Sequence, residues 1–203
     1  MKRKGTILII TGLLLITAAL CLVFSNLHEE ISAGETADIA VEKLHEDTEL
    51  IAKEKEKSET ITVPEMYLDP DREMPETEIN GVKYIGTLEI EALGLSLPVA
   101  SQWSYVNLRS SPCRYTGSAY NNTLTICAHN YNTHFGRLKE LSPGDVIYFV
   151  DVEGTLFAYT VEEILILQPT DVEEMIDSEW DLSLFTCTIG GRTRVTVRCM
   201  RAN

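Results

Sequence analysis

The apolar run near the N-terminus most constrains what this chain can fold into. Residues Gly5 to Phe24 form 20 residues without a charge, long enough to cross about 30 Å of hydrocarbon as an α-helix. Three basic residues, Lys2, Arg3 and Lys4, precede the run, and acidic residues follow it. By the positive-inside rule, the basic end faces the cytoplasm. We therefore predict a single-pass protein of the cell membrane whose C-terminal part is extracytoplasmic.

Two other interpretations of this segment stay open. A cleaved signal peptide has a shorter apolar core and ends at small residues, whereas Leu27, His28 and Glu29 follow this core. A lipidated cysteine follows a small residue, whereas Leu20 precedes Cys21. An uncleaved signal anchor over residues 1–27 accounts best for the segment.

Residues 28–78 are predicted to form an acidic stalk that is partly helical. They contain 17 acidic and 5 basic residues. Up to about Ser58 they are rich in the helix formers Glu, Lys and Ala, and prolines then favour an extended chain. The apolar positions of the helical part are few: Ile39, Val41, Leu44, Leu50 and Ile51. We expect a solvated helix or a loose coiled-coil seam that holds the following domain away from the membrane.

Charge and cysteine spacing exclude several kinds of partner. The net charge of −14 would repel phosphates, so we predict no nucleic-acid partner. The five cysteines form no CxxC pair and no Cys/His metal spacing, and we predict neither a metal nor a cofactor. No carboxylate occurs from Trp103 to Asn122, so we also expect no dependence on calcium.

Residues 79–203 are predicted to form one β-rich domain. Short β-favouring runs alternate with turn signals such as Asn80-Gly81 and Gly190-Gly191. The predicted strands are Tyr84–Ile90, Leu95–Val99, Thr123–Cys127, Val146–Val150, Leu156–Ile166, Ser183–Thr186 and Val195–Met200. Two short helices are expected, at Phe135–Leu141 and at Val172–Ile176 with Asp171 as the cap. Many short strands and few helices are typical of a β-barrel or a sandwich.

Cys187 is the cysteine best placed for chemistry. It ends an apolar strand and precedes the tight Gly190-Gly191 turn, whereas Cys127 and Cys199 lie within strands. A thiol with a reference pKa of about 8.5 needs a nearby cation or histidine to act at neutral pH. In an antiparallel hairpin, Arg194 can lie beside Cys187, on the face opposite to Val195.

His129 repeats the placement of Cys187, because it also ends an apolar strand and begins a loop. If the two strands are parallel neighbours, both side chains reach the same edge of the sheet. His134 is interpreted as an ordinary loop residue. Arg192 is the rival of Arg194, and Arg192 and Arg198 are expected to contact solvent or a substrate carboxylate.

The segments TICAHNYNTHFG and SLFTCTIGGRTRVTV resemble those of sortases, in order and in spacing. That family has a strand ending in histidine, a strand ending in a T-L-x-T-C pattern and a strand carrying an arginine. The chain departs from the pattern at Ser183, in place of the first threonine, and at Ala128, where glycine is frequent. The resemblance covers roughly residues 80–203.

The resemblance implies a closed eight-stranded sortase-type β-barrel with one or two short helices, preceded by the transmembrane helix and stalk. It also implies a cysteine transpeptidase. Cys187 would attack an LPxTG-like sorting signal, His129 would handle the proton, and Arg194 would steady the substrate and the oxyanion. The acyl group, from a sorting-signal-bearing surface protein or a pilin, would pass to an amine of peptidoglycan precursor or of a pilin lysine. The segment 168–181 would form the wall of the cleft.

Two rival functions and the sortase class stay open. An L,D-transpeptidase carries a Ser-His-Gly pair leading into its cysteine, which Thr186-Cys187-Thr188 does not match. A non-catalytic anchored β-domain for surface binding is the other alternative. Asp69-Pro70-Asp71 faintly resembles the lid motif of pilin-polymerising sortases. The sequence favours a wall-anchoring or general role.

Overall fold

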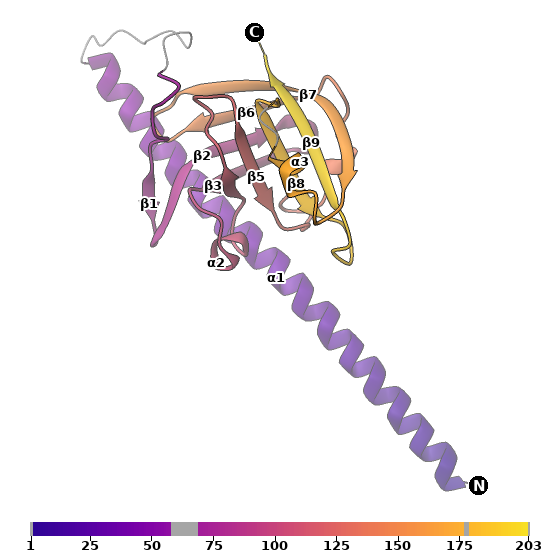
Figure 1. The fold of residues 1–203 in the computed structure, drawn as a ribbon. Coiled ribbons are helices and arrows are strands. Elements are labelled where there is room, and N and C mark those ends of the chain that lie inside the picture. The colour runs from indigo at the N-terminus through magenta and orange to yellow at the C-terminus, as the bar shows by residue number, and fades with distance from the viewer. Residues whose placement is uncertain (1, 58–68, 177–178, 203) are drawn as a thin grey trace.

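A single long helix leads into a β-barrel in the computed structural model, which describes residues 2–57, 69–176 and 179–202. Helix α1 runs from Lys2 to Lys57, which makes it about 84 Å long. Its N-terminal half stands clear of the barrel and its C-terminal half lies along the barrel (Figure 1). The predicted extended stretch around Pro64 falls outside the described residues.

Nine strands form one sheet that closes on itself. The order is β1-β2-β3-β4-β5-β8-β9-β7-β6, and β6 pairs back with β2. The strands are β1 Thr77–Ile79, β2 Val82–Ile90, β3 Leu95–Ala100, β4 Cys113–Thr116, β5 Leu124–Ala128, β6 Val146–Asp151, β7 Leu156–Leu167, β8 Leu182–Cys187 and β9 Arg194–Arg201. Strands β2 to β9 make the closed eight-stranded barrel that was predicted, and β1 adds a hairpin arm to β2.

The seven predicted strands are confirmed, and two short strands were missed. Strands β1 and β4 have three and four residues, too few to show an alternating pattern. The helical elements after α1 are equally short: α2 Tyr105–Leu108, α3 Val172–Met175, and the 3₁₀ turns η2 Glu91–Leu93 and η3 Leu138–Glu140. The predicted helix over residues 135–141 is thus one 3₁₀ turn. Asp171 precedes α3 as predicted, but its side chain accepts from the Gln168 amide instead of capping the helix.

Apolar side chains are buried on both faces of the barrel wall. The interior holds side chains such as Leu88, Ile126 and Val197. A second cluster on the outer face includes Cys127 and Phe185, and α1 and α3 cover part of it. The outer face of β9 is therefore covered as well: Thr196 and Arg198 face away from the interior of the barrel and are nevertheless buried.

Arg198 was expected to meet solvent or substrate, and that prediction is wrong. Its guanidinium donates to the Ser183 hydroxyl at 2.7 Å and to the backbone carbonyls of Glu174 and Met175. These bonds hold α3 against the outer faces of β8 and β9. Burying a guanidinium destabilises the fold unless its N–H donors are hydrogen-bonded in this way.

The stalk helix is docked on the barrel, not solvated as predicted. Ala33, Ala37, Ala40 and Leu44 are buried at helical spacing, and α1 packs mainly across β3. Of the large apolar residues expected in the seam, Leu44 lies in the contact, whereas Ile39 and Leu50 point elsewhere and are exposed by 51% and 59%. Alanine allows the helix backbone to approach the barrel closely, so the contact stripe carries little hydrophobic signal in the sequence.

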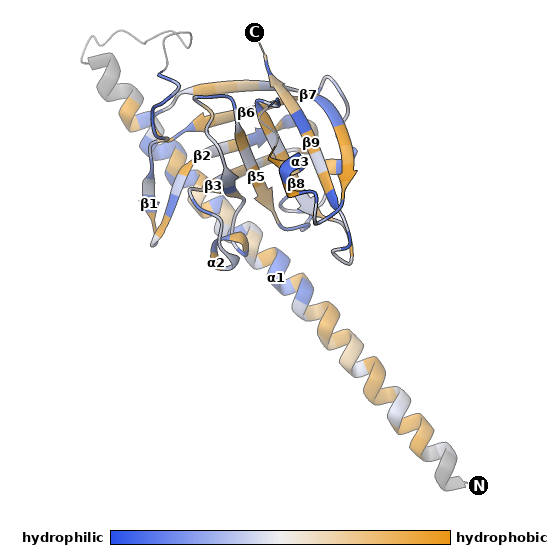
Figure 2. Cartoon of the chain, viewed as in Figure 1, coloured by the Kyte–Doolittle hydropathy of each residue, from blue (hydrophilic) through white to orange (hydrophobic). Residues whose placement is uncertain are grey.

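The N-terminal half of α1 is exposed and apolar. Figure 2 shows orange residues along this free half, whereas the docked half is mixed. The helix is long and apolar enough to cross a membrane, by length and composition. A 20-residue apolar surface without a protein partner agrees with the predicted membrane span.

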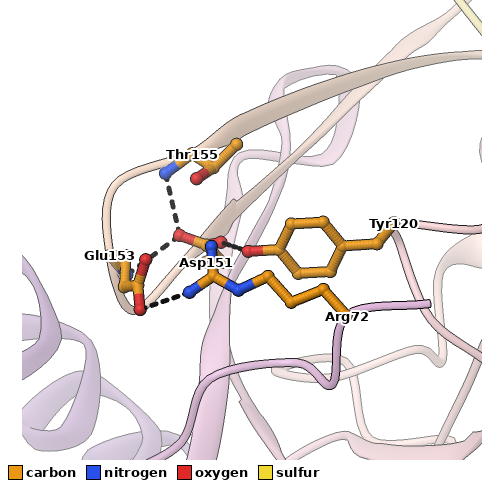
Figure 3. A network of polar contacts seen from close by, with 5 residues as sticks. All are labelled: Arg72, Tyr120, Asp151, Glu153 and Thr155. Carbon is orange, nitrogen blue, oxygen red and sulfur yellow. Dashed lines mark hydrogen bonds and ion pairs between the residues drawn. The ribbon is translucent and has the colours of Figure 1, made fainter. Parts of the chain in front are cut away.

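A polar network closes the barrel at the end far from Cys187 (Figure 3). The Tyr120 hydroxyl donates to Asp151 Oδ2 at 2.5 Å, and Asp151 Oδ1 accepts from the amides of Glu153 and Thr155. Arg72 lies over the Tyr120 ring at 5.3 Å and pairs with Glu153 at 2.6 Å. The network therefore ties the chain entering β1 to the β6–β7 turn.

Replacing Ala37, one of the buried alanines between α1 and the barrel, should release α1 from the barrel. We expect Ala37→Arg to cost about 1–3 kcal/mol of docking free energy, because a larger charged side chain cannot fit there. Hydrogen–deuterium exchange of the full chain in detergent should then speed up across β3 and residues 30–48. Ile39→Arg, on the exposed face of the same helix, is the control. Equal exchange in the two variants would show that α1 does not dock in solution.

Removing one hydroxyl should test the closing network. We expect Tyr120→Phe to lower the free energy of unfolding by about 1–3 kcal/mol, because buried Asp151 loses its phenol donor. Urea unfolding of the full chain in detergent measures the loss. Tyr148→Phe is the control, since Tyr148 lies on the outward face of β6. A loss no greater for Tyr120→Phe than for Tyr148→Phe would contradict this account.

Candidate active site

Parallel pairing of β5 with β8 brings two predicted site residues to one edge. Ala128 is the register partner of Thr186, so His129 and Cys187 follow directly at the same end of neighbouring strands. The Thr186 hydroxyl donates to the Ala128 carbonyl at 2.8 Å, which ties the residue before Cys187 to the residue before His129. The predicted parallel arrangement of these strands is confirmed.

Antiparallel pairing of β8 with β9 places Arg194 directly beside Cys187. The connecting turn is built by Thr188 and Thr193, whose backbone groups bond at 2.9 Å and whose hydroxyls lie 3.0 Å apart. Gly190 and Gly191 have φ values of 83° and 70°, a region that side chains with a Cβ rarely adopt. The chain therefore reverses tightly enough for β8 and β9 to stay paired up to Cys187.

The Arg194 guanidinium is partly committed to its own turn. Its Nη1 donates to the carbonyls of Gly191 and Thr193, both at 3.1 Å. Residues 2–57, 69–176 and 179–202 supply no hydrogen-bond partner to its Nε or Nη2, so these donors can serve another acceptor. Arg192, the rival, is exposed on the turn.

Cys187 differs from the other four cysteines in its surroundings. It is half-buried at the strand end, whereas Cys113, Cys127 and Cys199 are buried and Cys21 lies exposed on α1. Burial raises the pKa of the Cys113 thiol to about 12, and it raises the pKa values of Cys127 and Cys199 as well. All five cysteines are free, and only Cys187 combines access with a neighbouring cation.

The loop after β5 and helix α1 surround His129. Burial lowers the pKa of His129 below 6.5; Arg109 lowers it further, and Glu29 of α1 partly offsets these effects. The imidazole stacks at 5.0 Å on Tyr131, which in turn lies 5.6 Å from His134. His129 thus sits where the barrel, the loop after α2 and the stalk helix meet.

His134 lies in the loop after β5, as expected, and it is buried there. It is fully buried, and neither ring nitrogen has a hydrogen-bond partner among the described residues. Burial and the neighbouring His129 lower its pKa to about 4, so the ring stays neutral at physiological pH. The His134 ring contacts Tyr131, which in turn contacts His129.

An aromatic row beside the cysteine was missed from the sequence. Phe185, two residues before Cys187 on the same face of β8, meets Tyr115 edge-on at 5.2 Å. Trp103 continues the row at 6.4 Å from Tyr115 and packs on Tyr105 at 5.1 Å. These rings come from three separate segments, and no local pattern links them in the sequence.

Two further expectations concern the surroundings of the site. Segment 168–181 lies beside the outer cluster, with Met175 packed there, although residues 177–178 are outside the described part. The Asp69-Pro70-Asp71 turn lies with Arg72 at the opposite end of the barrel, so it does not cover Cys187.

In the described residues, no group of three or more His, Cys, Asp or Glu side chains is arranged to hold a metal.

Known structures share this architecture. Clostridium perfringens sortase D5 matches with a TM-score of 0.59 at 18% identity, over 83% of this chain and 99% of that chain. Streptococcus pneumoniae sortase C matches with a TM-score of 0.55 at 22% identity, over 83% and 95%. Streptococcus suis sortase C1 matches with a TM-score of 0.52 at 25% identity, over 59% and 73%. Likenesses at or below 25% identity establish the fold, and no curated protein sequence matches the chain.

The sequence itself supplies the assignment to a family. Residues 88–202, which are more than half of the chain, match the family model described as the sortase domain. The match spans β5, β8 and β9 and therefore includes His129, Cys187 and Arg194. The chain belongs to the sortase family.

Proposed function

We propose that this sortase-family transpeptidase is anchored in the membrane by α1 and uses Cys187 as its nucleophile. The acyl donor is a protein bearing a C-terminal LPxTG-like sorting signal, either a surface protein or a pilin. The acceptor is an amine, of peptidoglycan precursor or of a pilin lysine. The observation that carries the proposal is the meeting of Cys187, His129 and Arg194 at one barrel edge.

The first half-reaction forms a thioester. The Cys187 thiolate adds to the scissile carbonyl of the sorting signal, and the electron pair of the C=O bond moves to oxygen. The C–N bond then breaks, and the departing amine takes a proton from the His129 imidazolium. The free Nε and Nη2 donors of Arg194 are suited to hold the developing oxyanion or the substrate backbone.

The second half-reaction reverses these steps with a new amine. His129, now neutral, accepts a proton from the incoming amine as its nitrogen adds to the thioester carbon. The C–S bond breaks and Cys187 leaves as the thiolate. The lowered pKa of His129 favours the neutral imidazole that this half-reaction requires.

The aromatic row is suited to hold the peptide before the reaction. Tyr115 and Trp103 offer exposed rings, and the buried ring of Phe185 joins Tyr115 to the strand that ends at Cys187. Segment 168–181 would supply the remaining wall of the cleft. The pilus-related neighbours Streptococcus pneumoniae sortase C, described with pilin substrate specificity, and sortase C of Group B Streptococcus support pilins as one substrate class.

The nucleophile is tested by trapping the acyl-enzyme. Incubation of the full chain in detergent with a library of sorting peptides should give a covalent adduct on Cys187, identified by mass spectrometry of its peptides. Cys187→Ala should abolish the adduct and lower transpeptidation by about three orders of magnitude or more. Cys199→Ala, which removes a buried sulfur, should keep the adduct. Loss of the adduct in Cys199→Ala alone would overturn the assignment.

The surroundings of His129 are tested by its titration. NMR of the imidazole should give a pKa below 6.5, because burial and Arg109 both disfavour the imidazolium. Arg109→Gln should raise this pKa, since it removes a like charge, and Glu29→Gln should lower it further. Arg137→Gln, whose guanidinium pairs with Glu140, is the control and should leave it unchanged. A pKa that falls in Arg109→Gln would contradict the arrangement.

A further inference from the structure

We propose that the barrel edge around the site rests on the outer surface of the bilayer and binds anionic phospholipid headgroups there. The membrane-facing rim is defined as the loop 101–112, which contains α2, and the turn 188–193. The inference rests on the membrane anchor of the proposed function. It adds where the barrel sits relative to that membrane and which surface meets it.

The path of α1 sets the distance between the membrane and the site. Glu30 Oε1 accepts from the Asn132 amide at 2.8 Å, and Asn132 follows His129 by three residues. Glu30 is six residues beyond Phe24, the end of the apolar run, which corresponds to about 9 Å along a helix. Because the helix is continuous, no flexible spacer separates the site from the membrane.

The direction of α1 sets which end of the barrel faces the membrane. Its first docked turns meet the loop after His129, whereas Thr48 lies beside Gly154, in the turn at the opposite end. The helix therefore runs along the barrel, starting from the end that carries the site. In Figure 1 the β8–β9 turn projects on the side from which the free half of α1 departs.

Strand register places the whole rim at this end. Ala100, just before loop 101–112, pairs with Cys113, and Cys113 pairs with Cys127 next to the end of β5. The turn 188–193 follows Cys187 directly. Arg109 and Ser110 of the loop also share a cavity with His28 and Glu29 of α1, just beyond the apolar run.

The rim exposes several large apolar and aromatic side chains. Ile189 at the tip of the turn is 92% exposed, and Tyr105, Val106 and Trp103 are 75%, 78% and 42% exposed. Tryptophan and tyrosine are the residues that favour the membrane–water interface, where an apolar body and a polar tip are both satisfied. Exposed Ile189, in the turn after Cys187, adds an apolar side chain at the same end of the barrel.

The charge of the rim is opposite to that of the chain. The chain has a net charge of −14, yet residues 101–112 and 188–193 contain no Asp or Glu and carry exposed Arg109 and Arg192. The acidic helix α3 lies over Arg198, four residues along β9 from Arg194 and so away from the rim. Cations beside apolar side chains fit anionic phospholipids, whereas a second copy of this acidic chain would be repelled.

The placement has a consequence for substrates. A peptide tethered to the same membrane reaches Cys187 by moving along the bilayer surface, without leaving it. Confinement to the surface raises the effective concentration of a tethered donor or acceptor at the site.

Single-tryptophan reporters test the proposal in the full chain. Trp103 and Trp180 are replaced by Phe, and one tryptophan is introduced by Ile189→Trp. Leu156→Trp is the matched control, because Leu156 is 52% exposed and lies at the opposite end of the barrel. Each protein is reconstituted into phosphatidylglycerol vesicles with brominated acyl chains, which quench only tryptophans in contact with the lipid.

We expect the Ile189→Trp fluorescence to fall at least about two-fold relative to vesicles without bromine, and the Leu156→Trp fluorescence to stay unchanged. Phosphatidylcholine vesicles, or the paired substitutions Arg109→Gln and Arg192→Gln, should weaken the quenching. Equal quenching of the two reporters, or none of either, overturns the proposal. Quenching that ignores both lipid charge and the arginines overturns the selection of anionic headgroups.

Two further measurements separate the possible failures. Resistance to alkaline carbonate extraction reports the anchor alone, so an extractable protein overturns the anchor on which the rim depends. Adduct formation on Cys187 of the unsubstituted chain, reconstituted into the same vesicles, reports the chemistry alone. If the Ile189→Trp emission shifts to the blue with rising protein-to-lipid ratio and without quenching, a second copy covers the rim and the lipid proposal is overturned.

Discussion

The parallel pairing of β5 with β8 is the constraint on which the site depends. Strands far apart in the sequence become neighbours, and their matched ends bring His129 beside Cys187. The hydrogen bond from Thr186 to the Ala128 carbonyl reinforces this register at the last paired residues. A slip of one residue would turn Cys187 to the opposite face of the sheet. The barrel therefore positions the reactive groups through strand register, before any loop contributes.

The second organising interaction is the contact between α1 and the barrel. Small residues at Ala33, Ala37 and Ala40 let a helix backbone lie close to the sheet, so a segment with a weak apolar signal becomes part of the domain. The same helix supplies Glu29 to the surroundings of His129 and Glu30 to the loop that follows it. The helix that carries the apolar run is thus also part of the wall of the site.

The charged groups of the chain are divided by position. More than half of the 31 carboxylates lie between residues 28 and 78 of the sequence. The rim and the strand that follows Cys187 carry arginines and no carboxylates, which suits both an oxyanion and an anionic membrane surface. Arg198 shows the structural use of the same residue type, since it is buried and fastens α3 to the barrel.

The amino-acid sequence alone predicts the apolar span, the strands of normal length and the strand-end positions of Cys187 and His129, because period and local composition mark these features. It also indicated Arg194 as the neighbour of Cys187, since a tight Gly190-Gly191 turn leaves little choice of register. Three features emerge only in the folded chain: the stalk docks on the barrel, Arg198 is buried, and Phe185, Tyr115 and Trp103 form a row. Each of these depends on which surfaces meet, and contacts between distant segments leave no periodic signal in the chain. Alanine docking and buried arginine are the clearest cases, because packing overrides the usual preference of each residue type.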